Sequence, residues 1–217
     1  MIKNCALIIV IILALFFVNT TSALASPCEL ITPECTLGMF IDSVKNGNGN
    51  EIRGVVVPGL FASPVVQQPE NQTGYVSDKA NDITQHNIAE RNGVIGLLAH
   101  NEMEEEEFVG ELFHSIEGGD IVILVMGDGR SKLYRVEEKV HYQKISPNDN
   151  WSMYKELTNN NLFSTWQIFN KHYQTEDRYS PVVFQTCVKG YGISNWGLVF
   201  IRATPIAFHY RISIQHH

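Results

Sequence analysis

Short apolar runs separated by turn residues recur from residue 52 almost to the end of the chain, and they limit the possible fold more than any other feature. Each run has four to nine residues, a length that suits a strand better than a helix. Gly127-Asp128-Gly129, between two of these runs, is a hairpin signal. We expect strands at residues 52–57, 63–66, 93–100, 120–126, 132–140, 181–188 and 197–203, and a further edge strand at 206–217.

Helical periodicity is limited to two short segments. Apolar residues recur at helical spacing in residues 109–116 and line one face of residues 161–172, so each segment predicts a short helix. Residues 26–50 look loop-like and end in a cluster of asparagines and glycines. Many short strands with few helices predict a mainly β chain. It would fold as a single closed or nearly closed β-barrel with short helices in the connections.

The composition is that of one globular domain. Apolar residues make up 44% of the chain and charged residues 18%, which is enough apolar surface for a core and too little charge for a disordered chain. The length of 217 residues fits one domain with some chain left for an export segment. The net charge of -7 argues against a nucleic-acid partner, because phosphate binding needs a basic face.

The first 25 residues have the layout of a secretory signal peptide. Lys3 precedes the apolar run 5–18, and Ala23-Leu24-Ala25 is a small-x-small cleavage site. The run of 14 residues is shorter than the ~20 that a membrane span needs, so we favour cleavage, with a retained anchor as the alternative. We therefore expect an exported protein, extracellular or on the outer face of the cytoplasmic membrane. It would consist of a signal peptide (1–25), an N-terminal extension (26–50) and a barrel domain (51–217).

The cysteines single out one residue. Cys5 lies in the cleaved segment, so the mature chain keeps Cys28, Cys35 and Cys187. In an oxidising compartment this odd count suggests one pair and one free thiol. We predict a disulfide between Cys28 and Cys35, which enclose a short loop with a proline; the alternative is that both are reduced and buried. Cys187 remains, and a thiol becomes a nucleophile where a base or cation lies nearby.

His100 and Arg202 are the candidate partners of this thiol. His100 follows the apolar run 94–99 and so stands at a strand end, where functional residues often lie. Arg202 interrupts the apolar run 198–203, and a guanidinium there must pair with something or face a cleft, where it can hold an oxyanion. The plainer alternatives are an ordinary surface or core histidine and an arginine on the solvent face of the barrel.

The acidic run at residues 102–107 follows His100 closely. We interpret it as a solvated loop, because it lacks the alternating ligand spacing of a dedicated Ca²⁺ loop. A Ca²⁺ site there is the alternative. His141 and His172 are interpreted as ordinary surface or core histidines.

Several segments together resemble the sortase family of cell-surface transpeptidases. Phe184-Gln185-Thr186-Cys187 is similar to the second half of the family's Thr-Leu-x-Thr-Cys signature, with Val183 in place of the first threonine. The other similar segments are the histidine segment 96–101 (with Ala99 where many members have glycine), the Gly-Asp strand start 118–123, the early strand pair 55–58 and 64–66, and Arg202, which stands 15 residues after Cys187. The similarity runs from about Arg53 to Ala203.

The resemblance implies a sortase-like barrel and a transpeptidase. Cys187 would be the nucleophile that attacks a backbone carbonyl in a sorting peptide, typically of the Leu-Pro-x-Thr-Gly type. Arg202 would stabilise the oxyanion and fix the peptide, and His100 would act as general acid and base. The thioester would then pass to an amine or to water. In sortases the region matching 146–180 helps to shape the sorting-signal groove. Here this region is long and rich in aromatic residues, so the peptide motif that the chain would recognise stays open.

The partners implied are the sorting signal of a surface protein and an amine acceptor, with no cofactor required and no nucleic acid. Membrane contact would come only through an uncleaved N-terminal anchor. Two other functions stay open at this point. One is another kind of secreted thiol peptidase, and the other is a sortase-fold surface or binding protein with an altered site.

Overall fold

The structure is a computed structural model that describes residues 36–103, 106–149, 151–190 and 193–206. The predicted signal peptide, both cysteines of the predicted disulfide and nearly all of the predicted edge strand at 206–217 lie outside these residues. Within the described ranges, every helix is too short or too polar to cross a bilayer.

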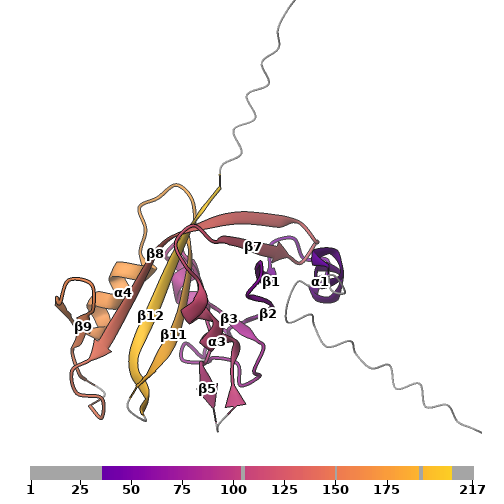
Figure 1. Ribbon diagram of the computed structural model, residues 1–217. Coiled ribbons are helices and arrows are strands. Elements are labelled where there is room, and N and C mark those ends of the chain that lie inside the picture. The colour runs from indigo at the N-terminus through magenta and orange to yellow at the C-terminus, as the bar shows by residue number, and fades with distance from the viewer. Residues whose placement is uncertain (1–35, 104–105, 150, 191–192, 207–217) are drawn as a thin grey trace, which may run out of the picture.

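Eight strands of the described chain close into a barrel, which confirms the predicted fold class (Figure 1). Around the barrel the order is β8-β12-β11-β4-β3-β2-β1-β7, and β7 pairs again with β8 to close it. Two neighbouring pairs, β2–β3 and β4–β11, are parallel, and the other pairs are antiparallel. The strands are β1 (Ile52–Val57), β2 (Phe61–Gln67), β3 (Ile83–His86), β4 (Ile95–Leu98), β7 (Ile121–Met126), β8 (Ser131–Lys144), β11 (Val182–Gly190) and β12 (Ile193–Pro205).

Strand β8 is long enough to pair with two different strands along one edge. Its first residues pair with β7, while its last three pair with β9 (Tyr154–Glu156), which in turn pairs with β10 (Leu162–Phe163). Along β12, Arg202 faces Glu138 but Ala203 faces Val136, so Glu137 forms a bulge. The acidic run forms a separate small ribbon of β5 (Glu102–Met103) and β6 (Glu106–Glu107), where a loop was expected.

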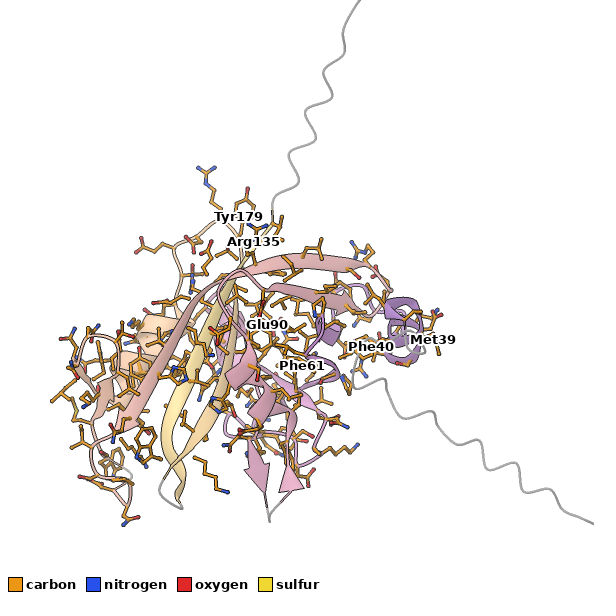
Figure 2. The ribbon with its side chains drawn as sticks, viewed as in Figure 1. Met39, Phe40, Phe61, Glu90, Arg135 and Tyr179 are labelled. Atoms are coloured by element: carbon orange, nitrogen blue, oxygen red, sulfur yellow. The ribbon has the colours of Figure 1, made fainter. Side chains whose placement is uncertain are left out.

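Helix α1 (Leu37–Val44) corrects the expectation that residues 26–50 are loop-like. The Thr36 hydroxyl caps the helix by accepting a hydrogen bond from the Met39 N–H. Phe40 and Val44 are buried against the outside of β1, β2 and β7. Figure 2 shows Phe40 directed toward the barrel and Met39 on the other side of the helix.

The remaining helices lie in the connections, as predicted. They are α2 (Asn87–Arg91), α3 (Val109–Leu112) followed by a 3-10 turn (Phe113–Ser115), and α4 (Thr165–Tyr173). The predicted helix at 109–116 is confirmed, while that at 161–172 is correct only for its second part. Ser164 and Gln167 form a capping box there, which starts α4 and leaves Leu162 and Phe163 in β10.

Two apolar clusters lie on the two faces of β11 and β12. Because side chains alternate along a strand, Phe184 and Ile201 point into the barrel, whereas Val183 and Phe200 point outward. Helix α4 covers this outer face with Ile168, His172 and Tyr173, all buried. The same alternation assigns Cys187 and Arg202 to the outer face of the barrel.

Candidate active site

Cys187 is a partly buried free thiol near the carboxyl end of β11. It lies directly opposite Leu198 on β12, which lies opposite Tyr142 on β8. These three residues form a row across the outer face of the sheet. The thiol therefore lies on the side of the barrel that α4 and the β9–β10 extension occupy.

His100 lies at the corresponding end of the neighbouring strand. Strands β4 and β11 are parallel, with Leu98 opposite Gln185, and the Ala99 N–H donates to the Gln185 carbonyl at 3.3 Å. Strand β4 ends at Leu98, and an extension of this register by two residues would bring His100 level with Cys187. The predicted base therefore follows the carboxyl end of the strand next to the one that contains the predicted nucleophile.

Two residues that follow the acidic ribbon, Phe108 and Gly110, contact His100. The Gly110 N–H donates to the His100 carbonyl at 3.0 Å, and the imidazole meets the Phe108 ring edge-on at 6.0 Å between centroids. A Cβ on Gly110 would overlap the His100 carbonyl oxygen and lie 2.6 Å from the Thr186 hydroxyl. Only glycine lets α3 pack this closely against the histidine and against the strand of Cys187.

Arg202 lies at the other end of the β11–β12 pair. It faces Val183, four residues before Cys187, which is about 13 Å along a strand. Its guanidinium donates to the Asp177 carboxylate at 3.0 Å and to the Thr175 hydroxyl at 3.4 Å. The structure therefore does not bring Arg202 beside the thiol, because the hairpin register puts Leu198 there instead. An oxyanion role for Arg202 stays a prediction.

Lys144, the last residue of β8, is a cation that the sequence did not single out. Its side chain is buried, with 5% exposed, and the ammonium donates to the Pro147 carbonyl at 3.3 Å. Burial raises the pKa of the Cys187 thiol, and the positive charge of Lys144 partly offsets that rise. The predicted strand 132–140 ends four residues before Lys144, so the apolar pattern held no signal for this residue.

A groove of about 820 Å³ runs beside α4. Trp166 and Phe169 stack in parallel at its side, 5.5 Å between ring centroids, and Trp151 is 92% exposed. The lining residues are uncharged: Ile88, Asn92, Trp151, Ser164, Thr165, Trp166, Phe169 and Gln174. Phe169 also contacts Tyr173, whose hydroxyl donates to the Gln185 side chain at 2.5 Å. Through these two contacts the groove residue Phe169 is linked to Gln185 of β11, two residues before Cys187.

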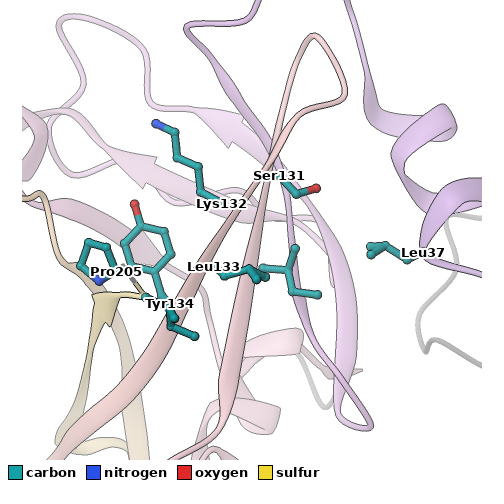
Figure 3. Close-up of a pocket in the computed structure, with 8 residues that line it drawn as sticks. Leu37, Ser131, Lys132, Leu133, Tyr134 and Pro205 are labelled. Carbon is teal, nitrogen blue, oxygen red and sulfur yellow. The ribbon is translucent and has the colours of Figure 1, made fainter. Parts of the chain in front are cut away.

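A second pocket, of about 430 Å³, lies between the start of α1, the β7–β8 hairpin and the end of β12 (Figure 3). Its described lining contains neither a cysteine nor a histidine: Leu37, Ile123, Ser131, Lys132, Leu133, Tyr134, Pro205 and Ile206. The pocket therefore lacks the pair of cysteine and histidine that the predicted chemistry requires.

His172 is a core residue, as interpreted from the sequence. Its ring stacks on Phe200 at 4.2 Å, and its Nε2 lies 2.8 Å from the Tyr142 hydroxyl. Burial, together with the charges of Lys171 and Arg202, lowers the pKa of His172 to about 3. Within the described ranges, no three histidine, cysteine, aspartate or glutamate side chains are grouped to hold a metal ion.

Comparison with known proteins gives likenesses only to solved structures, since no family model and no curated protein matches. Sortase A from Corynebacterium diphtheriae is 10% identical, with a TM-score of 0.48, over 80% of this chain and 71% of that one. Sortase C1 from Streptococcus suis is 12% identical, with a TM-score of 0.47, over 76% of each chain. Sortase A from Listeria monocytogenes is 14% identical, with a TM-score of 0.46, over 72% and 88%. The barrel described above rests on its own strand pairing and not on these distant likenesses.

Proposed function

We propose that the chain is an exported cysteine transpeptidase of the sortase type, with Cys187 as nucleophile and His100 as general acid and base. The observation that supports this proposal is the parallel pairing of β4 and β11, which ends at Leu98 and Gln185, two residues before His100 and Cys187. The order of the motifs along the sequence supports the same assignment. Residues 1–25 would direct export, and residues 51–217 would form the catalytic barrel.

The reaction would begin with a neutral thiol, because burial raises the pKa of Cys187. The thiol proton passes to the His100 imidazole as the sulfur forms a bond to a backbone carbonyl carbon of the substrate. The C–N bond then breaks, and the imidazolium gives the proton to the departing amine. In the second half, an acceptor amine or water attacks the thioester and loses a proton to His100, and the Cys187 sulfur leaves and takes that proton from the imidazolium, which restores the neutral thiol.

The substrate would be a peptide that lies along the aromatic groove beside α4. In sortases the region matching 146–180 shapes the groove for the sorting signal, and here this region contributes Trp151, Trp166 and Phe169. The uncharged lining suits apolar side chains rather than acidic or basic ones. Arg202, at the far end of β11 from the thiol, would contact the peptide there, if the peptide displaces its ion pair with Asp177.

Two observations favour a second function. Burial raises the pKa of the Cys187 thiol, and Arg202 already has a carboxylate partner, so neither group is prepared for catalysis in the way the family pattern implies. A sortase-fold binding protein that uses the aromatic groove without cleavage would need neither group.

Trapping of the acyl-enzyme separates the two functions. The protein is incubated with a library of sorting-type peptides, and intact mass spectrometry looks for a thioester adduct on Cys187 that hydroxylamine releases. We expect the adduct with the native chain and none with Cys187→Ala, while the circular dichroism spectrum stays unchanged. Peptide turnover retained by Cys187→Ala would refute the mechanism, and peptide binding without any adduct would favour the binding protein.

A further inference from the structure

Lys144 carries a buried positive charge for which the described residues provide no carboxylate partner. Three other lysines of the described chain have such a partner: Lys171 pairs with Glu156 at 2.7 Å, Lys139 with Glu117 at 2.8 Å and Lys45 with Asp42 at 2.6 Å. Lys144 is 5% exposed, and among the described residues its three N–H donors have one acceptor, the Pro147 carbonyl. A buried ammonium without a counterion is costly, so this charge needs an explanation from its surroundings.

The sheet register places Lys144 on the face that carries Cys187. Tyr142, Leu198 and Cys187 lie opposite one another on β8, β12 and β11, and Lys144 is two residues beyond Tyr142 on the same face. The separation is about 10 Å across two strands and about 7 Å along them, so the two Cα atoms are about 12 Å apart, and the four-carbon lysine stem covers part of that separation. The ammonium therefore acts electrostatically on the thiol.

The other titratable groups around the thiol come from different elements. His100 follows β4, Tyr154 on β9 lies within electrostatic reach of the thiol, and Lys189 lies two residues further along β11. Burial and the neighbouring Cys187 both raise the pKa of the Tyr154 hydroxyl, so at neutral pH it is uncharged. Lys189 is exposed, so water screens its charge more strongly than that of Lys144.

We propose that Lys144, rather than Arg202, is the cation that stabilises negative charge on the Cys187 sulfur and on the oxygen of the tetrahedral carbon that forms beside it. The part concerning the sulfur depends only on the structure, whereas the part concerning the carbonyl oxygen rests on the proposed function. In the resting protein the neutral thiol leaves Lys144 without a counterion. The negative charge that appears during attack would supply one, so the interaction is strongest in the transition state.

The test measures the thiol directly. The full chain is alkylated with iodoacetamide between pH 6 and 11, and mass spectrometry of the peptide that contains Cys187 gives its rate apart from the other cysteines. For Lys144→Met we expect the midpoint of the rate-against-pH curve to rise by about one unit, since one nearby charge is removed. Lys144→Arg, which keeps the charge, should stay close to the native midpoint.

Two control variants each remove a positive charge other than that of Lys144. Lys189→Met removes an exposed charge two residues from Cys187, and Arg202→Met removes the charge that the family pattern would assign to the site; both should leave the midpoint unchanged. An unchanged midpoint in a folded Lys144→Met variant would overturn the proposal, as would an equal shift in Arg202→Met. Because alkylation needs no substrate, the result stands whether or not a peptide is cleaved. If the native chain forms the acyl-enzyme but Lys144→Met leaves the midpoint unchanged, the transpeptidase proposal stands and the role of Lys144 is refuted.

Discussion

Replacement of Gly110 by alanine tests whether α3 positions the candidate base. The new Cβ would overlap the His100 carbonyl oxygen and lie 2.6 Å from the Thr186 hydroxyl. Since a strand lies on one side and the core on the other, α3 must move away and lengthen the 3.0 Å hydrogen bond from Gly110 to His100. The carbonyl of the predicted base, and with it the ring, should shift with the helix.

The cost can be worked from three contributions. Overpacking costs about 1–3 kcal/mol, and the weakened hydrogen bond costs about 1 kcal/mol. The better helix propensity of alanine returns about 0.5–1 kcal/mol. The net loss in the free energy of unfolding is then about 1–3 kcal/mol, which for a domain of this size lowers the Tm by about 3–10 °C. A displacement of the base by about 1 Å would slow acyl-enzyme formation by about 100-fold.

Urea unfolding and the rate of acyl-enzyme formation measure the two effects. Gly118→Ala is the matched control, because a Cβ there meets no atom within 4 Å and the residue does not have a positive φ. We expect the control to remain within about 0.5 kcal/mol of the native chain. If Gly110→Ala unfolds at the same urea concentration as Gly118→Ala and acylates at the native rate, the positioning role assigned to α3 is wrong.

Three further predictions concern other parts of the molecule. The lowered pKa of His172 means that the unfolded chain binds a proton below about pH 6.5 while the native chain does not until about pH 3. Stability should therefore be full above pH 6.5 and fall by a few kcal/mol toward pH 3, and urea unfolding of His172→Phe should show a shallower fall; an equal fall would contradict this assignment. Trp166→Ala should raise the KM for the best library peptide about tenfold and leave the Tm unchanged, since this side chain is 66% exposed; an unchanged KM would remove the groove from the substrate site. Phe40→Ala should cost about 3–5 kcal/mol, measured by urea unfolding, because Phe40 is fully buried, whereas Met39→Ala on the 54% exposed side should cost almost nothing; equal effects would mean that α1 does not pack on the barrel.

The strands that the sequence predicted best are those with an apolar pattern and clear turns at both ends. Strand β1 begins and ends at the predicted residues, and β7 differs by one residue at its start. Strand β3 was not predicted, because Ile83-Thr84-Gln85-His86 contains one apolar residue. All four are buried, since a closed barrel with a helix outside covers both faces of the strand.

The candidate site was predictable only as far as local sequence determines it. His100 follows an apolar run and Cys187 lies near the end of another, so a histidine just after β4 and a cysteine within β11 could be predicted. The relation of Arg202 to Cys187 depends on the length of the β11–β12 hairpin, which continues to Gly190 and Ile193, and spacing alone does not determine that register. Lys144 reaches the site through the pairing of β8 with β12, and such long-range pairing leaves no local pattern.

The bulge at Glu137 has a consequence for how this chain can change in length. Before the bulge, Tyr134 and Val136 point into the barrel; after it, Val140 and Tyr142 point outward, so one extra residue has reversed the phase of the strand. Insertion or deletion of a single residue between the bulge and Lys144 would reverse the phase again. The lysine would then point into the apolar interior. Viable length variants of this segment should therefore differ by two residues at a time, a parity rule that a library of insertions and deletions in β8 would reveal.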